Sequence, residues 1–324
     1  MLSAFASELG KKLAERWLTL LVLPGALYLA VAVAARVLGH AHALDPSRLL
    51  PWLDSVAESK AASGIGGVTV LSAGVLVAAA AAGIAAQALG TVLERVALAA
   101  DWRQLPAWSR ERVARRVAAR RVAWEAAARD WHALRRAAAT AAATRQPYDP
   151  APRLEALRAM RKIAPESPDR PTWSGDRLNA TAVRLERDLG VDIAVCWPHM
   201  WLLIPDAERT QLTSVRSDLA RAAVLGGWAL LYLPLVWWWW PALPIAVAMG
   251  VTAWRRTRAA ADAWARALET SCRMHLRKAA DQLGVDTTTV VTPYALGQEV
   301  TRLLEGSPPP PPPPSPSEPP VSGP

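Results

Sequence analysis

The sequence predicts an all-α membrane protein, with four transmembrane helices in two hairpins, a mainly helical, Arg-rich cytoplasmic module and a disordered proline-rich C-terminal tail. Three observations lead to this prediction: long apolar stretches, one basic segment between them, and a run of prolines. Apolar residues form 52% of the 324 positions and the mean hydropathy is +0.11, yet the net charge is +9. High hydropathy and strong basicity occur together because they are segregated along the chain.

Four stretches have the composition of membrane spans. A hydrocarbon core about 30 Å thick needs about 20 helical residues, and the interiors of these stretches carry no charged residue or histidine. The fourth has only 13 residues, about 20 Å of helix. It therefore either crosses with Arg255 and Arg256 reaching back to the interface, or re-enters on the same side. The stretches are Trp17–Val37, Gly64–Leu93, Ala222–Trp238 and Ala242–Trp254.

Basic residues set the expected orientation. The segment 101–221 holds 22 Lys and Arg residues and the region after Trp254 holds eight, whereas the loop 38–63 has only Arg48 and Lys60. Cytoplasmic flanks carry the excess of positive charge, so both termini and the basic segment are expected in the cytoplasm. The predicted parts are an N-terminal flank 1–16, a hairpin 17–100, a cytoplasmic helical module 101–221, a second hairpin 222–254, a cytoplasmic helical segment 255–306 and a tail 307–324.

Small residues recur at helical spacing in the second stretch. Such residues let helix backbones approach closely in a membrane, although an alanine-rich composition gives the same pattern. Spans without charged residues disfavour a proton-coupled transporter, because proton relays need ionisable side chains. An oligomeric pore with an uncharged lining, and a homo-oligomer, are still compatible with the sequence. The candidate helix-packing residues are Ala79, Gly83, Ala86 and Gly90.

The basic segment starts with a predicted helix over Ala107–Thr140, which contains no Gly or Pro. Apolar residues from Val113 to Ala138 follow the three- and four-residue steps of a coiled coil, interrupted only by Arg120. The arginines either contact the anionic inner leaflet, at about 1 kcal/mol each, or form a solvated face that enforces topology. Nucleic acid is the least favoured partner because no reader motif accompanies them. The candidate lipid- or partner-facing arginines are Arg112, Arg115, Arg116, Arg120 and Arg121.

The stretch Val191–Ile204 is apolar and aromatic but, at 14 residues, short for a crossing. We expect it in the membrane interface or packed on the helical bundle, with Trp197 and Trp201 as further lipid- or partner-facing candidates. Cys196 and His199 have the spacing of metal ligands or of a nucleophile and its base, but no third partner is evident. We therefore expect no catalytic residue, cofactor or metal site.

Two sets of motifs resemble one family. Arg16–Gly25 reads RWLTLLVLPG, and Pro171–Arg177 reads PTWSGDR, followed by Gly190–Asp192 and Cys196–Pro198. These stretches resemble uncharacterised multi-pass membrane proteins of high-GC Gram-positive bacteria. The resemblance implies residence in the bacterial cytoplasmic (inner) membrane and brings no assigned activity with it.

Seven consecutive prolines open the C-terminal tract Pro308–Pro320. Such a tract forms polyproline II, so we expect either an inert disordered tail or a ligand for an aromatic groove in a partner protein. The sequence as a whole predicts a membrane-anchored scaffold, sensor or effector subunit that is not an enzyme. The alternatives are an oligomeric pore, channel or transporter component, and an enzyme acting on lipid at the membrane interface.

Overall fold

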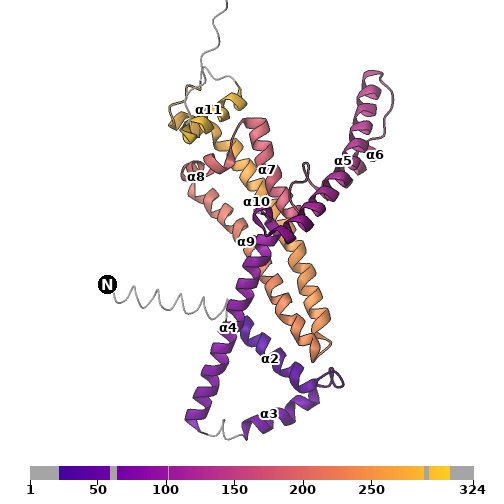
Figure 1. Ribbon diagram of the computed structural model, residues 1–324. Coiled ribbons are helices and arrows are strands. Elements are labelled where there is room, and N and C mark those ends of the chain that lie inside the picture. Colours follow the sequence, from indigo (N-terminus) through magenta and orange to yellow (C-terminus); the bar gives the residue numbers. More distant parts are fainter. Residues whose placement is uncertain (1–21, 59–63, 101, 288–291, 307–324) are drawn as a thin grey trace, which may run out of the picture. The chain divides into compact units, whose positions relative to one another are not determined.

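The computed structural model describes residues 22–58, 64–100, 102–287 and 292–306 (Figure 1). Within these ranges every regular element is a helix and none is a strand, so the all-α prediction is confirmed. The N-terminal flank, the start of the first stretch at Trp17 and the tract Pro308–Pro320 lie outside the described residues. The helices are α2 (Leu23–Leu38), η2 (Pro46–Arg48), α3 (Leu49–Ala57), α4 (Ile65–Leu98), η3 (Trp102–Gln104), α5 (Ala107–Ala143), α6 (Ala151–Ile163), α7 (Trp173–Leu189), α8 (Ile193–Leu203), α9 (Asp206–Tyr232), η4 (Leu233–Trp237), α10 (Ala242–Gln282) and α11 (Pro293–Glu305).

The chain forms two compact units. The first unit comprises Met1–Leu178 and Thr213–Trp264, and the second comprises Asn179–Leu212 and Ala265–Pro324. Helices α7, α9 and α10 each contribute residues to both units. The boundaries expected after residues 221 and 254 fall inside α9 and α10, where the helix continues without a break.

Two helices of the described chain are long and apolar enough to cross a membrane, Gly66–Leu98 and Asp206–Trp237. The described part of the first stretch, α2, is shorter, and the apolar part of α10 is only its first third. Near the end of Asp206–Trp237, α9 gives way to the 3₁₀-helix η4, which has Pro234 in its first turn. The pyrrolidine ring lacks an N–H and clashes with the preceding turn, which accounts for the change.

In the first unit, α4 packs closely against α2 and α9 (Figure 1). A Cβ on Gly25 of α2 would lie 2.0 Å from the carbonyl oxygen of Ala79, and one on Gly227 of α9 would lie 2.2 Å from that of Ala86. These approaches need glycine, because any side chain would meet the backbone of α4. The structure buries all four of the small residues singled out in the second stretch, Ala79, Gly83, Ala86 and Gly90.

Helices α5 and α6 form a helical hairpin (Figure 1). The apolar seam expected along α5 is its least exposed side, with Val117 buried and Trp124 half-buried. The indole of Trp124 donates to the carbonyl oxygen of Ala164 at 3.0 Å, and the Tyr148 hydroxyl donates to that of Leu134 at 3.1 Å. The seam therefore packs within the same chain.

The second unit is built around one apolar core that takes side chains from α7, α8, α10 and α11. Helix α11 comes close enough to α7 that a Cβ on Gly297 would lie 1.9 Å from the carbonyl oxygen of Leu189. The stretch Val191–Ile204 forms α8, which buries Cys196 and Met200 in this core. One side of α8 is thus packed on the helical bundle, which was one of the two placements expected.

Candidate functional site

The C-terminal end of α4 is held by the loop 164–172. The last carbonyl groups of an α-helix have no partner within the helix. The Thr172 hydroxyl donates to the carbonyl oxygen of Ala97, and the Arg170 guanidinium donates to that of Ala99 at 3.1 Å. Arg170 also places a positive charge at the negative end of the helix dipole. The loop therefore terminates α4 and fixes its last turn.

A buried ion pair between Arg120 and Asp176 holds the loop in turn. Arg120 Nη2 lies 2.6 Å from Asp176 Oδ2, and the same guanidinium donates to the carbonyl oxygens of Ile163 and Pro171. The other carboxylate oxygen accepts two backbone N–H groups of the loop, at 2.9 and 2.7 Å. Burial raises the pKa of Asp176 above its ordinary value, although these N–H groups and Arg120 act in the opposite direction. Burial likewise lowers the pKa of Arg120.

This pair explains the break in the apolar seam of α5. Arg120 stands at a seam position, between Val117 and Trp124, and its side chain is only 17% exposed. We expected Arg120 among the lipid- or partner-facing arginines, but the structure turns it inward to bind Asp176 and the carbonyl oxygens at the end of α6 and in the loop. A guanidinium has five donors and no acceptor, so it suits a position surrounded by carbonyl and carboxylate oxygens.

A second set of contacts ties α7 to α10 within the first unit. Arg177 Nε lies 2.6 Å from Asp262 Oδ1, and the Arg177 side chain is 7% exposed. The Arg258 guanidinium lies 4.3 Å from the ring centroid of Trp173 and 5.3 Å from that of Trp254. Cation–π contacts of this kind favour a fixed position of both rings. The motif PTWSGDR is therefore a structural junction between helices distant in sequence.

An apolar groove of about 620 Å³ lies beside this junction, which we call the α4-end groove. One wall is fixed because the indole N–H of Trp102 donates to the carbonyl oxygen of Asp169 at 3.0 Å. Arg103 binds the side chain of the same aspartate at 2.7 Å. The groove is lined by Arg95, Val96, Leu98, Ala99, Ala100, Trp102, Leu105, Val113 and Pro171.

The outer face of α5 is basic. Arg112, Arg115 and Arg116 are exposed and make no ion pair with any of the described residues. Arg121 is half-exposed and donates to the carbonyl oxygen of Pro168 at 3.2 Å. Three of the five arginines singled out in the sequence thus have no ion-pair partner within the described ranges, while Arg121 binds the loop.

No family model, curated protein or solved structure matches the chain. The resemblance to multi-pass membrane proteins therefore rests on its motifs alone.

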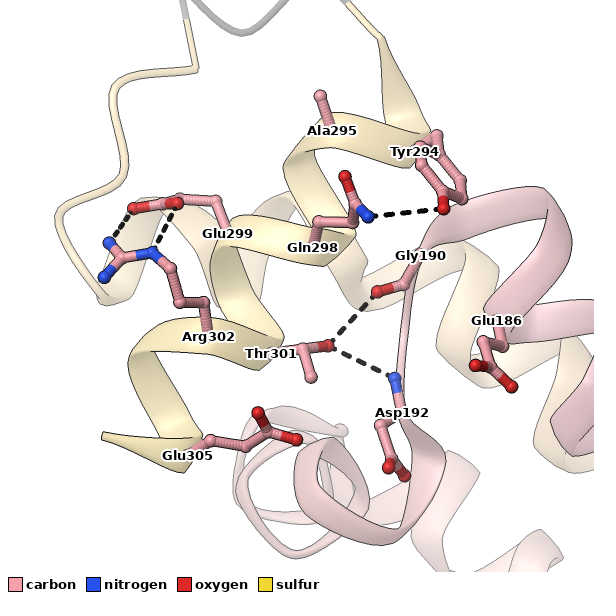
Figure 2. Close-up of a pocket in the computed structure, with 10 residues that line it drawn as sticks. All are labelled: Glu186, Gly190, Asp192, Tyr294, Ala295, Gln298, Glu299, Thr301, Arg302 and Glu305. Carbon is pink, nitrogen blue, oxygen red and sulfur yellow. Dashed lines mark hydrogen bonds and ion pairs between the residues drawn. The ribbon is translucent and has the colours of Figure 1, made fainter. Parts of the chain in front are cut away.

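The second unit has a polar pocket of about 580 Å³ between the end of α7, the start of α8 and one side of α11 (Figure 2). Thr301 joins its two sides, since its hydroxyl oxygen accepts from the backbone N–H of Asp192 and donates to the carbonyl oxygen of Gly190. Glu299 pairs with Arg302, which lowers the pKa of the glutamate. No group of three metal-ligating side chains occurs in the part of the chain that the structure describes. The polar contacts of this pocket therefore fasten α11 to its neighbours.

The aromatic and sulfur-bearing side chains of α8 do not form a reactive constellation. The rings of Trp197 and Trp201 lie 5.8 Å apart, with the Arg209 guanidinium 5.6 Å from the Trp201 ring. Cys196 Sγ lies 3.4 Å from the Thr301 hydroxyl, and burial raises the pKa of this thiol. His199 Nδ1 instead contacts the carbonyl oxygen one turn back in its own helix, at 3.3 Å. The structure does not bring Cys196 and His199 together.

Four side chains that organise the first unit had no structural role assigned from the sequence: Asp176 and Arg177 entered only as part of the motif PTWSGDR, and Arg170 and Asp262 not at all. The two ion pairs join residues that are 56 and 85 positions apart. Periodicity reports which side of a helix is apolar but not which loop will meet it. The one local signal was Arg120 itself, because an arginine at a seam position implies a buried partner.

Proposed function

We propose that the chain is an integral protein of the bacterial cytoplasmic membrane that anchors a helical cytoplasmic module and serves as a scaffold, sensor or effector subunit. In this proposal it crosses the membrane four times and has both termini in the cytoplasm. The basic face of α5 then meets the anionic inner leaflet, and the second unit offers a surface for a protein partner.

The exposure of α4 is the observation that carries the proposal. The core helix of a soluble protein can be as long and apolar as α4, but such a helix is mostly buried. Only 11% of the most apolar window of α4 is buried, and Val70 and Val77 are 73% and 70% exposed. A surface of this kind is stable in lipid and costly in water, at roughly 25 cal/mol per Å².

The helices packed on α4 support the further crossings. Its neighbour α9 is continued by η4, and the most apolar window of this combined span, Asp206–Trp237, is 44% buried. The glycine contacts of α2 and α9 with α4 are the close approaches that favour helix association in lipid. Trp237, Trp238 and Trp240 are exposed at the turn between α9 and α10, as suits an aromatic belt at the outer interface.

An oligomeric pore or channel component is the second candidate, favoured by the same exposed surface of α4. Contact with other copies of the chain would remove Val70 and Val77 from water as effectively as lipid does. The two interpretations differ in ion flux from protein reconstituted into liposomes, which only the pore predicts. A lipid-processing enzyme at Trp197 and Trp201 is less favoured, since the nearest thiol is buried and bonded to Thr301.

A topology map tests the membrane position directly. Single cysteines replace Ser55 before α4, Thr140 at the end of α5 and Met274 in the second unit, all of them exposed. The native thiols can stay, because both are buried and burial raises the pKa of Cys272 to about 12. They label only after denaturation and so report the amount of protein.

An impermeant maleimide added to intact cells should label position 55 alone, with positions 140 and 274 labelled only after permeabilisation. Equal access to positions 55 and 140 would mean that α4 does not cross the membrane, and the proposal would be wrong. Labelling of 274 but not of 140 from outside would mean that the second hairpin crosses only once. Positions 55 and 140 together test the crossing of α4, and positions 140 and 274 together test the second hairpin.

A further inference from the structure

We infer that the α4-end groove binds one anionic phospholipid of the cytoplasmic leaflet, with an acyl chain along its apolar wall and the phosphate at Arg95. The inference rests on the proposed membrane position of α4. It adds a specific ligand and binding site to that position.

The depth of the groove fits a phospholipid. Glu94 and Arg95 are the first charged residues after the apolar run of α4. Val96 and Leu98, which line the groove, follow Glu94 by two and four residues, or about 3 and 6 Å along the helix axis. This places the groove where acyl chains give way to headgroups. Val96 and Leu105 are 60% and 40% exposed, so the described chain leaves apolar surface uncovered here.

The charge around the groove selects an anionic headgroup. Arg95 lines the groove, is exposed, and makes no ion pair among the described residues. Glu94 does not neutralise it, because its carboxylate is already bonded to Arg216. On α5, Arg112 and Arg116 stand one residue before and three residues after the lining residue Val113, and both are exposed. Apolar walls with unpaired arginines at the edge complement one acyl chain and one phosphate.

The groove is also largely preformed. The Trp102 indole is fixed by its bond to the loop, and the loop is fixed by the buried pair of Arg120 with Asp176. A volume of about 620 Å³ lies within the usual range of small-molecule pockets. Little ordering is then needed when the lipid binds, which favours affinity.

Lipid binding to the full chain in detergent micelles, followed by native mass spectrometry, tests the inference. The probes are dioleoyl phosphatidylglycerol, dioleoyl phosphatidylcholine and glycerol phosphate, which has the charge but no acyl chain. We expect one phosphatidylglycerol per chain, bound at least about fivefold more tightly than phosphatidylcholine. Glycerol phosphate should not compete at equal concentration.

Two variants test the apolar groove and the phosphate contact separately. Ala100→Trp fills the groove at an exposed, non-helical lining residue and should abolish the tight phosphatidylglycerol site. Arg95→Gln should weaken phosphatidylglycerol about fivefold and phosphatidylcholine less, because the choline cation already offsets the charge of its phosphate. Val77→Trp on α4 and Arg136→Gln on α5 are matched exposed controls outside the groove, and both should bind as the wild type does. Unchanged circular dichroism shows that each variant is folded.

Wild-type binding by Ala100→Trp, equal affinity for the two lipids, or full competition by glycerol phosphate would each overturn the inference. Failure of the proposed function is seen separately, by extraction of cell membranes with alkaline carbonate. A chain released by carbonate is not an integral membrane protein. A chain that is retained but shows no preference for phosphatidylglycerol overturns the groove inference alone.

Discussion

Each unit contains an Arg–Asp ion pair with a similar N–O distance. The pKa of the aspartate is nevertheless shifted in opposite directions in the two pairs. In the first unit Arg120 lies 2.6 Å from Asp176, with side chains 17% and 2% exposed. In the second unit Arg273 lies 2.8 Å from Asp188, with side chains 38% and 37% exposed. Burial raises the pKa of Asp176, whereas the Arg273 hydrogen bond lowers the pKa of Asp188. Access to solvent, more than the distance between the charges, determines how much such a pair contributes to the free energy of unfolding.

The largest expected effect comes from breaking the buried pair. Arg120→Met leaves the Asp176 carboxylate buried without its charged partner and removes the donors to the carbonyl oxygens of Ile163 and Pro171. We expect a loss of about 3–5 kcal/mol in the free energy of unfolding. Denaturant unfolding of the full chain in detergent, followed by circular dichroism, measures this loss.

Arg129→Met is the matched control, nine residues away at an exposed position of α5, and should stay within about 0.5 kcal/mol of the wild type. The double variant Arg120→Met with Asp176→Leu should recover part of the loss, because it removes the unpaired charge. Equal stabilities of Arg120→Met and Arg129→Met would show that burial of the pair does not matter.

Breaking the exposed pair should lower the free energy of unfolding far less. Arg273→Met removes a guanidinium that also binds Glu269 at 3.2 Å, but water can solvate all three groups. We expect a loss of about 0.2–1 kcal/mol, and a smaller loss at high salt because ions screen exposed charges. The same unfolding measurement at low and high ionic strength provides the check. A loss as large as that of Arg120→Met would remove the distinction between the two pairs.

Much of the fold follows from sequence patterns, while the buried pair does not. The three- and four-residue steps of α5 predicted both its length and its exposed arginines, because one helix period determines which residues share a face. Asp176 and its loop are different, since their partners come from helices more than forty residues away. A one-dimensional pattern contains no information on that pairing. The direction of the Arg120 side chain was therefore missed although its position in the seam was evident.

Acidification should change the contributions of the two carboxylates to stability in opposite directions. The pKa of Asp188 is lower in the folded chain than its ordinary 3.8, so this group stabilises the fold above pH 3.8 and the stabilisation is lost as pH falls through the folded value. The pKa of Asp176 is raised, so its ionisation opposes folding as pH rises from 3.8 through the folded value.

Asp188→Asn should therefore make the loss of stability on acidification shallower, and Asp176→Asn should make it steeper. The free energy of unfolding, measured between neutral pH and pH 3, gives the slopes. The wild-type chain, measured in the same series, gives the reference slope. Slopes that change in the same direction for Asp176→Asn and Asp188→Asn would contradict the opposite pKa shifts.

The smallest effect is expected for an exposed arginine that makes no ion pair within the described part of the chain. Arg115 is exposed on α5 and makes no ion pair among the described residues, so Arg115→Gln should change stability by less than about 0.5 kcal/mol in phosphatidylcholine nanodiscs. If α5 lies on the anionic leaflet, the same variant should lose about 1 kcal/mol in nanodiscs containing phosphatidylglycerol. Thermal unfolding in the two kinds of nanodisc measures both values. An identical, small effect in both lipids would mean that water, and not lipid, is the partner of this face, and that its charge serves topology alone.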